Sequence, residues 1–306
     1  FAEIAQEVAA NYLLKIKVLD TKDIEAEGMG ALLAVAKASE EPPKLVVLEY
    51  EGKPGAKTIG IVGKGVTFDS GGLNIKPTDG IFRMYGDMAG AAATLGAMKA
   101  IAKMKLPINV VGVMPLAENF VSSSSYRPGD ILHSMSGKTI EVLNTDAEGR
   151  LLLADALTYI QKHYHLDAVA DIATLTGAIV IALGRFVSGV FSNDKSLVQR
   201  AFHAGEISGE RVWELPVYEE YRSQLVSDVA DIENIGGRSA GSITAAVFLK
   251  EFVENNLPWI HIDIAGTSMM EEEVMRYVKN PYIPKEGATG TGTRLLYHFV
   301  ESFVEN

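Results

Sequence analysis

The chain has 306 residues, 47% of them hydrophobic, and a formal net charge of −11 from 39 acidic and 28 basic residues. Nucleic-acid-binding proteins normally carry a basic excess, so this charge argues against a DNA-binding or RNA-binding protein. The absence of cysteine excludes a disulfide scaffold and any zinc site built on thiolates. The apolar runs are far shorter than the roughly 20 residues of a membrane-spanning helix, and no polybasic run suits an anionic lipid surface.

The first residue, Phe1, is not an initiator methionine, and no signal-peptide pattern follows it. We therefore expect a processed form or a fragment from which an N-terminal region is missing. The absence of cysteine also fits a protein of the reducing cytosol, so a cytoplasmic location is expected.

The beginning of the chain predicts two helices and then two strands. An amphipathic helix is expected over residues 1–14 and a second one from about residue 25 to residue 39. Residues 44–50 and 58–63 are predicted strands, and the short loop between them predicts that they pair antiparallel. Residues 64–86 carry few regular signals, and a loop of this length indicates a functional or a disordered segment.

From residue 87 onward, predicted helices and strands alternate. The strands are continuously apolar, which predicts an α/β layered fold around a buried, mostly parallel sheet. Ser242 is the predicted N-cap of its helix. Because there is no internal repeat and no low-complexity linker, we expect one domain over residues 1–306. The predicted helices cover residues 87–104, 151–164, 196–207, 217–225, 242–254 and 293–304, and the predicted strands cover residues 108–114, 139–143, 168–174 and 259–264.

The segment Asn144-Thr-Asp-Ala-Glu-Gly-Arg150 joins a predicted strand to a predicted helix. It places two carboxylates and a guanidinium close together, at the kind of junction where mostly parallel sheets build their sites. Asp146 and Glu148 also have a simpler interpretation, because acidic residues cap helix N-termini. The neighbouring Arg150 and further acids elsewhere in the chain favour a site over a cap.

Four carboxylates from three strand-end loops would repel one another strongly if they met in a cleft without cations. Two divalent metal ions would cancel this charge, and oxygen-rich ligation suits Mg²⁺, Mn²⁺ or Zn²⁺. None of the six histidines lies near these acids and no His-Glu-x-x-His motif occurs, which disfavours a histidine-based zinc site. The four candidates are Asp69, Asp87, Asp146 and Glu148, with Asp79 as a weaker fifth.

Three cationic residues, Lys64, Lys76 and Arg150, are interleaved with these acids. A lysine beside metal ions can polarise a carbonyl oxygen. An arginine can hold a carboxylate-shaped anion through two parallel hydrogen bonds. The alternative is that all three only balance charge at the surface, where most lysines lie.

The octapeptide Asn144-Thr-Asp-Ala-Glu-Gly-Arg-Leu151 resembles the signature of the leucine aminopeptidase family, the two-metal cytosol aminopeptidases. Eight ordered blocks carry the resemblance from about residue 62 to the C-terminus, which makes it specific. It implies a three-layer α/β/α fold with a mixed, mostly parallel central sheet, of the zinc-peptidase and phosphorylase type. The other blocks cover residues 62–72, 75–76, 85–92, 126–130, 171–177, 234–237 and 261–266.

The resemblance also implies which residues bind metal. Lys64, Asp69, Asp87 and Glu148 would hold a tighter-bound ion, and Asp69, Asp146 and Glu148 a more exchangeable one, with Asp69 and Glu148 bridging the two. Lys64 would bind as a neutral amine, so its pKa would have to be strongly depressed. Two Zn²⁺ or Mn²⁺ ions per subunit are implied, with Mg²⁺ as an alternative in one site.

The resemblance implies a leucyl aminopeptidase in which a metal-bridging water attacks the carbonyl of the N-terminal residue. Lys76 would polarise that carbonyl, and Arg150 would anchor a bicarbonate ion as general base. The free amine of the peptide would ligate a metal ion, so a blocked N-terminus would prevent binding. A largely apolar pocket would favour leucine-like residues and would be lined by Met84, Asn144, Ala147, Thr174, Gly177, Ala265 and Ser268, with backbone contacts to the peptide from Thr174 and Leu175.

The resemblance further implies a homo-hexamer that acts on peptides and on neither nucleic acid nor membranes. The separate N-terminal domain of the family is expected to be absent, because the chain begins at about the helix that links the two domains. Two segments depart from the family pattern and leave the fine substrate preference open. They are the serine-rich residues 117–126 and the long acidic residues 270–284, which are expected near the pocket rim.

Three competing interpretations are weaker. A serine hydrolase would use Ser239 in Gly237-Arg-Ser-Ala-Gly241 with Asp263 and His298, but a polar turn precedes the motif where a strand is required. Residues 52–58 fail as a phosphate-binding loop, because alanine stands where the glycine before the lysine is needed and a strand follows. The third interpretation, a non-catalytic binding protein on the same fold, is disfavoured by the complete metal-ligand set.

Overall fold

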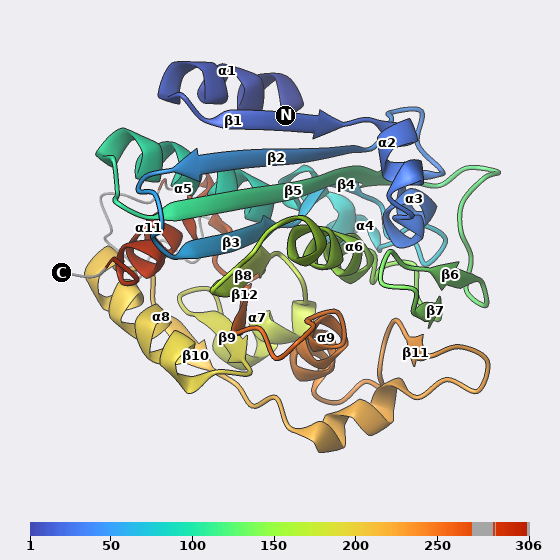
Figure 1. Ribbon diagram of the computed structural model, residues 1–306. Helices are drawn as coiled ribbons and strands as arrows, with labels where there is room; N and C mark the ends of the chain where they lie inside the picture. The colour runs from blue at the N-terminus through green and yellow to red at the C-terminus, as the bar shows by residue number, and fades with distance from the viewer. Residues whose placement is uncertain (271–283, 285, 305–306) are drawn as a thin grey trace.

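A nine-stranded mixed sheet forms the centre of the computed structural model, which describes residues 1–270, 284 and 286–304 (Figure 1). Its strand order is β1-β2-β5-β3-β8-β12-β9-β10, and β4 also pairs with β5. The pairs β1–β2, β2–β5 and β9–β12 are antiparallel and the other pairs of this sheet are parallel, which confirms the predicted sheet. The strands are β1 (Lys15–Leu19), β2 (Lys44–Glu51), β3 (Thr58–Gly63), β4 (Gly65–Asp69), β5 (Asn109–Asn119), β8 (Ala168–Ala173), β9 (Ser188–Ser192), β10 (Val212–Glu214) and β12 (Trp259–Asp263).

Helices cover both faces of this sheet, which confirms the predicted three-layer α/β/α arrangement (Figure 1). Because strand side chains alternate between the faces, the central strands contribute to two apolar cores. Ile59 and Ile61 of β3 belong to one core and Val62 to the other. The first core includes residues of α1 (Ala2–Tyr12), α5 (Ala89–Met104), α8 (Lys195–Ser208) and α11 (Thr293–Glu301); the second includes residues of α3 (Gly30–Ala36), α6 (Gly149–His163), α7 (Gly177–Leu183) and α9 (Gly241–Lys250).

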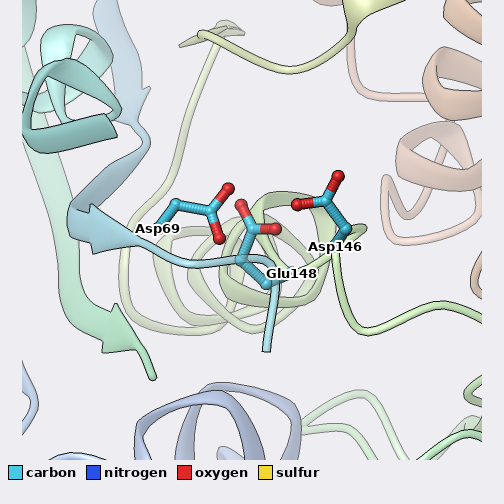
Figure 2. A group of neighbouring side chains, drawn as sticks. All are labelled: Asp69, Asp146 and Glu148. Carbon is cyan, nitrogen blue, oxygen red and sulfur yellow. The ribbon is translucent and has the colours of Figure 1, made fainter. Parts of the chain in front are cut away.

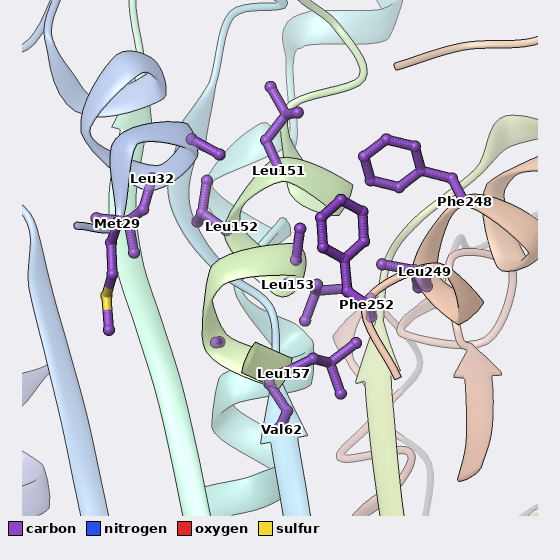
Figure 3. Close-up of a cluster of buried hydrophobic side chains, with 14 of the residues drawn as sticks. Met29, Leu32, Val62, Leu151, Leu152, Leu153, Leu157, Phe248, Leu249 and Phe252 are labelled. Atoms are coloured by element: carbon purple, nitrogen blue, oxygen red, sulfur yellow. The ribbon is translucent and has the colours of Figure 1, made fainter. Parts of the chain in front are cut away.

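Helix α6 is buried along most of its length, and its leucines pack against α9 and the residues after it (Figure 3). Leu151 and Leu157 belong to the same core as Phe248 and Phe252, and all four side chains are fully buried. A helix that is buried on nearly all sides packs against neighbouring elements all around it. The start of α6, where Asp146 and Glu148 lie, is therefore fixed relative to the sheet.

Helix α5 begins in direct contact with the strands beneath it. A Cβ atom at Gly90 would lie 2.2 Å from the carbonyl oxygen of Ile172 in β8, and one at Gly63 would lie 2.5 Å from the carbonyl oxygen of Gly90. The backbone N–H of Ala91 donates to the carbonyl of Lys64. Only glycine allows this close approach, and it sets the end of β3 against the residues that precede α5.

The predicted antiparallel pairing of residues 44–50 with 58–63 is wrong. Strand β5 lies between them, antiparallel to β2 and parallel to β3. Strand β5 has eleven mostly buried residues, which suits a central strand with a neighbouring strand on each side. The intervening turn, residues 52–57, therefore spans β5 and does not form a tight hairpin.

Four smaller predictions need correction. The helix expected over residues 25–39 is two helices, α2 (Thr21–Ala26) and α3, separated at Gly28 with a φ of 75°. Strand β7 (Thr139–Glu141) belongs to a separate small sheet with β6 (Ile131–His133) and β11 (Ile232–Glu233), so the acidic motif follows the small sheet and not the central one. Ser242 is not an N-cap, because Ala240 holds that position. Residues 217–225 contain the 3₁₀ helix η2 (Glu219–Leu225) in place of an α-helix.

Strands β1 and β4 were not expected, and residues 179–190 resolve into α7 and the start of β9. The remaining short elements are α4 (Thr78–Ile81), η1 (Met84–Gly86), β13 (Met269–Met270) and β14 (Gly287–Ala288). Of the segment expected at the pocket rim, residues 271–283 lie outside the described residues. Among the helices that the structure describes, none has the length and apolar character needed to cross a membrane.

Candidate metal centre

The ends of several strands open onto one cavity of about 510 Å³. Lys64 follows β3, Asp69 ends β4 and Thr174 follows β8, and all three side chains line the cavity. Because these strands run in the same direction, their carboxyl ends meet at one edge of the sheet. Asp146 and Glu148 reach the same cavity from the residues before α6.

Asp69, Asp146 and Glu148 form a carboxylate cluster in this cavity. One oxygen atom of each lies within 4.8 Å of the others, and Figure 2 shows the three carboxylates converging. Asp69 and Glu148 are buried, whereas Asp146 is partly exposed. Glu148 is the N-cap residue of α6, yet its side chain makes no capping hydrogen bond. The simpler interpretation, that these acids only cap the helix, is therefore not supported for Glu148.

Two lysines compensate part of the negative charge of this cluster. The Nζ atom of Lys64 lies 2.7 Å from Asp87 Oδ2 and 2.9 Å from Glu148 Oε1, and that of Lys76 lies 2.8 Å from Asp69 Oδ2 and forms an ion pair with Asp146. Burial acts to lower the pKa of both amines, but the surrounding carboxylates outweigh it and raise both pKa values. The low pKa predicted for Lys64 would therefore require a bound cation, since burial alone does not overcome the carboxylates around this amine.

The pKa values of two buried carboxyl groups lie well above the ordinary value of a surface acid. Burial, with a further contribution from Asp69, raises the pKa of Glu148 to about 8. Burial also raises the pKa of Asp87 to about 6, although the neighbouring Lys64 and the hydroxyl of Thr174 act to lower it. Such values mean that the negative charge of this site is only partly stabilised by the protein itself.

These residues fit divalent cations. Glu148 Oε2 is buried and has no hydrogen-bond donor among the described residues, whereas Asp87 Oδ2 and Asp146 Oδ1 are each paired with a lysine ammonium group. A buried acceptor without a donor is energetically costly, and several carboxylate oxygens facing one space are hard ligands suited to divalent ions. Four carboxylates and one amine are thus available as ligands.

Arg150 lies behind the cavity and does not belong to its lining. Its Nη1 donates to the carbonyl of Asn234 at 2.8 Å, and its guanidinium stands 6.0 Å from the ring centre of Phe248. Burial lowers the pKa of Arg150 to about 10. Its Nε is buried and has no hydrogen-bond partner within the described residues. The side chain is therefore a buried cation whose Nε–H donor has no partner among the described residues.

The predicted substrate-binding residues divide into two groups. Asn144 and Ala147 are not among the residues that line the cavity, and the Asn144 side chain accepts a hydrogen bond from the backbone of Asp146. Further apolar lining that was not predicted comes from Phe82, Val180 and Met269. The predicted residues that do line the cavity are Met84, Thr174, Leu175, Gly177, Ala265 and Ser268.

Comparison with known proteins agrees with this geometry. Residues 1–297 match the family described as the cytosol aminopeptidase family, catalytic domain. The chain belongs to the cytosol aminopeptidase family. It is 53% identical over 301 residues to a probable cytosol aminopeptidase of Geotalea uraniireducens, covering 98% of this chain and 59% of the relative. It is 52% identical over 301 residues to a probable cytosol aminopeptidase of Syntrophotalea carbinolica, covering 98% of this chain and 59% of the relative. It is 49% identical over 291 residues to a probable cytosol aminopeptidase of Chlorobium limicola, covering 94% of this chain and 56% of the relative.

The family resemblance drawn from the sequence is thus confirmed, and the chain spans less than two thirds of the length of these relatives. The serine-hydrolase alternative finds no support in the described residues. Ser239 is exposed. The carboxylate of Asp263 accepts the hydroxyl of Thr176, and His298 Nδ1 lies 2.8 Å from Glu301. No hydrogen bond joins Ser239, Asp263 and His298 among the residues that the structure describes, so the triad is not assembled.

Two residues that support this candidate site had no role assigned from the sequence. Asn119, fully buried at the end of β5, donates to Asp69 Oδ1 and to the carbonyl of Thr145, both at 2.9 Å. Asn234 accepts from the backbone N–H groups of Leu143 and Asn144 and thereby holds the acidic motif from the side of β11. In the sequence, Asn119 is a polar residue at the end of a long apolar strand. That position indicates a functional contact, but it does not identify the residue that Asn119 contacts.

Proposed function

We propose that the chain is the catalytic part of a metal-dependent aminopeptidase that releases the N-terminal residue of peptides. The observation that carries this proposal is the convergence of Asp69, Asp146 and Glu148 in a cavity that also contains Lys64 and Lys76. Membership of the cytosol aminopeptidase family supports it. We further propose that residues 1–306 form one catalytic metallopeptidase domain.

Two divalent ions would occupy this centre. Lys64, Asp69, Asp87 and Glu148 would hold one, and Asp69, Asp146 and Glu148 the other. Zn²⁺ or Mn²⁺ suits these ligands, with Mg²⁺ as an alternative in one site. When bound, the ions would make a water molecule more acidic and polarise the scissile carbonyl. The buried Glu148 Oε2, which lacks a hydrogen-bond donor among the described residues, supports this assignment.

The protein's own cations would then act on the charge that develops during hydrolysis. Lys76 lines the cavity as an ammonium group and would donate to the carbonyl oxygen as it becomes negative. Arg150 would hold a bicarbonate ion that serves as general base. Its spare Nε donor supports an anion partner. Its position behind the lining means that such an anion would have to reach it at the back of the cavity.

The expected substrate is a peptide with a free N-terminus and an apolar first residue, preferably leucine. Met84, Leu175 and Ala265 line the cavity together with Phe82 and Val180, and apolar walls favour apolar side chains. A free amine would be attracted to the carboxylate cluster, whereas an N-acetyl group would lose that interaction and collide with the ligands. From the family resemblance we also propose a cytoplasmic homo-hexamer.

Hydrolysis of leucine p-nitroanilide by the purified protein tests this function. We expect activity with Mn²⁺ or Zn²⁺, loss of activity after exhaustive chelation, and recovery when either ion is added back. We also expect no turnover of N-acetyl-leucine p-nitroanilide. Activity that survives chelation, or equal turnover of free and acetylated substrates, would reject a two-metal aminopeptidase. The same protein with Ser239→Ala serves as control, and it should remain fully active if the serine has no catalytic role.

A further inference from the structure

One wall of the cavity is made by residues 174–177, which we call the wall segment. Its first residue is tied to the candidate metal ligands. The carbonyl of Thr174 accepts a hydrogen bond from Lys64 Nζ at 2.9 Å, and the hydroxyl of Thr174 donates to Asp87 Oδ1 at 2.7 Å. Every residue of the segment lines the cavity. The position of the wall therefore depends on what holds the rest of it.

A carboxylate at the end of β12 makes most of the hydrogen bonds to the rest of the wall segment, and the hydroxyl of Ser242 lies 2.7 Å from that of Thr176. Asp263 Oδ1 accepts the backbone N–H of Leu175 at 3.2 Å and that of Ala265 at 3.1 Å, and Oδ2 accepts the hydroxyl of Thr176 at 2.7 Å. The Thr176 hydroxyl oxygen in turn accepts the backbone N–H of Ile179 and so caps helix α7. One side chain thus orders two stretches of cavity lining, around Leu175 and around Ala265.

Asp263 is buried, so its charge needs compensation, and the structure supplies it from two sides. His261 lies two residues earlier in β12, and Arg150 is close enough for the two charges to interact. His261 Nδ1 is 2.5 Å from Asp171 Oδ1, and Asp171 Oδ2 accepts the indole N–H of Trp259 at 2.6 Å. His261 thus interacts with both Asp171 and Asp263, and burial raises the pKa of Asp263 less than it would without His261.

Resting on the proposed function, we propose that Asp263 is a positioning residue that fixes the wall segment against which the peptide binds. It does not line the cavity itself and acts through Leu175, Thr176 and Ala265. Because the wall would contact the peptide before and during the reaction alike, its displacement weakens both states to the same extent. The result is a change in KM with kcat largely retained.

The test is Asp263→Asn in the metal-loaded protein, with leucinamide as substrate. The loss of a charged acceptor is expected to raise KM roughly tenfold and to change kcat less than about threefold. The Mn²⁺ affinity, measured by calorimetry, should stay within about twofold of wild type, because no candidate ligand is altered. Thr176→Val, which removes the hydroxyl donor, should raise KM in the same direction, and the double variant should show less than the product of the two effects.

Asp155→Asn is the matched control. Asp155 is also a fully buried carboxylate that accepts two backbone N–H groups, from Leu32 and Met135, but it lies outside the cavity. We expect this variant to lose stability and to keep the wild-type KM. An unchanged KM in Asp263→Asn, or an equal KM change in Asp155→Asn, would overturn the proposal. If Asp263→Asn does not fold, Thr176→Val decides, since an unchanged KM there overturns it as well. A wild-type protein without peptidase activity would instead refute the proposed function.

Discussion

At the scale of single residues, Lys76 combines charge balance with a position suited to chemistry. Its amine pairs with Asp69 and Asp146, and its side chain lines the cavity. These carboxylates outweigh burial and raise its pKa, so the group stays cationic at neutral pH. A fixed cation in a partly water-excluded site stabilises developing negative charge far better than one in water. Lys64, buried more deeply between Asp87 and Glu148, serves the candidate ligand set instead.

Replacement of Lys76 by methionine preserves most of the side chain's length and removes the donor. We expect kcat for leucine p-nitroanilide to fall by about 10²–10³, with KM within about threefold of wild type, because the interaction forms mainly in the transition state. Lys138→Met provides the comparison, since Lys138 also forms a close ion pair, with Glu251 at 2.8 Å, away from the cavity. A Lys76→Met protein with wild-type kcat would remove Lys76 from the proposed chemistry.

At the scale of elements, the sequence identified β3, β8 and α6 at the site, but it did not identify β4, which ends in Asp69. The apolar pattern of α6 and the acidic motif before it are local, so residues 144–151 could be interpreted directly. The partner of β2 could not, because β5 is separated from it by more than fifty residues and only the complete sheet sets that pairing. Ser242 illustrates a second limit: its hydroxyl lies 2.7 Å from that of Thr176, a contact that no local pattern reveals.

The start of α5 gives a prediction at this scale. Gly90→Ala places a Cβ atom 2.2 Å from the carbonyl oxygen of Ile172, a backbone atom that cannot rotate away. Overpacking of this kind exceeds the gain in helix propensity, so we expect a loss of about 1–3 kcal/mol in the free energy of unfolding. Gly177→Ala, also at the first turn of a helix but with no atom within 4 Å of its Cβ, should not lose stability. Urea unfolding of the two variants measures the difference, and equal stabilities would contradict the close-packing argument.

At the scale of the whole molecule, the candidate site lies where strands of the central sheet end. Lys64, Asp69 and Thr174 lie at the carboxyl ends of β3, β4 and β8 and converge because those strands run in the same direction. The alternating pattern of apolar strands and helices predicted a mostly parallel sheet, but it did not predict β4 or the partners of β3. The residues that hold the site residues in place could not be predicted from this pattern. Asn119 holds Asp69 from fifty residues away, and Asp263 holds Leu175 from 88 residues away. Such contacts depend on the register of strands that pair only in the folded chain.

The surface of the chain leads to the last prediction. Large apolar side chains are exposed on several elements, among them Leu13 at 92%, Ile181 at 90% and Trp213 at 60% exposure. Exposed apolar side chains in such number favour association with another protein surface, although the net charge of −11 opposes it. We expect sedimentation equilibrium to give about six times the 33.0 kDa mass of the chain, as the family resemblance implies, and high salt to strengthen the assembly by screening its negative charge.

Ile181→Asp should weaken the assembly if that side chain is covered, whereas Lys53→Asp, a charge change on an exposed turn after β2, should have a much smaller effect. A monomer at every concentration and salt would refute the hexamer.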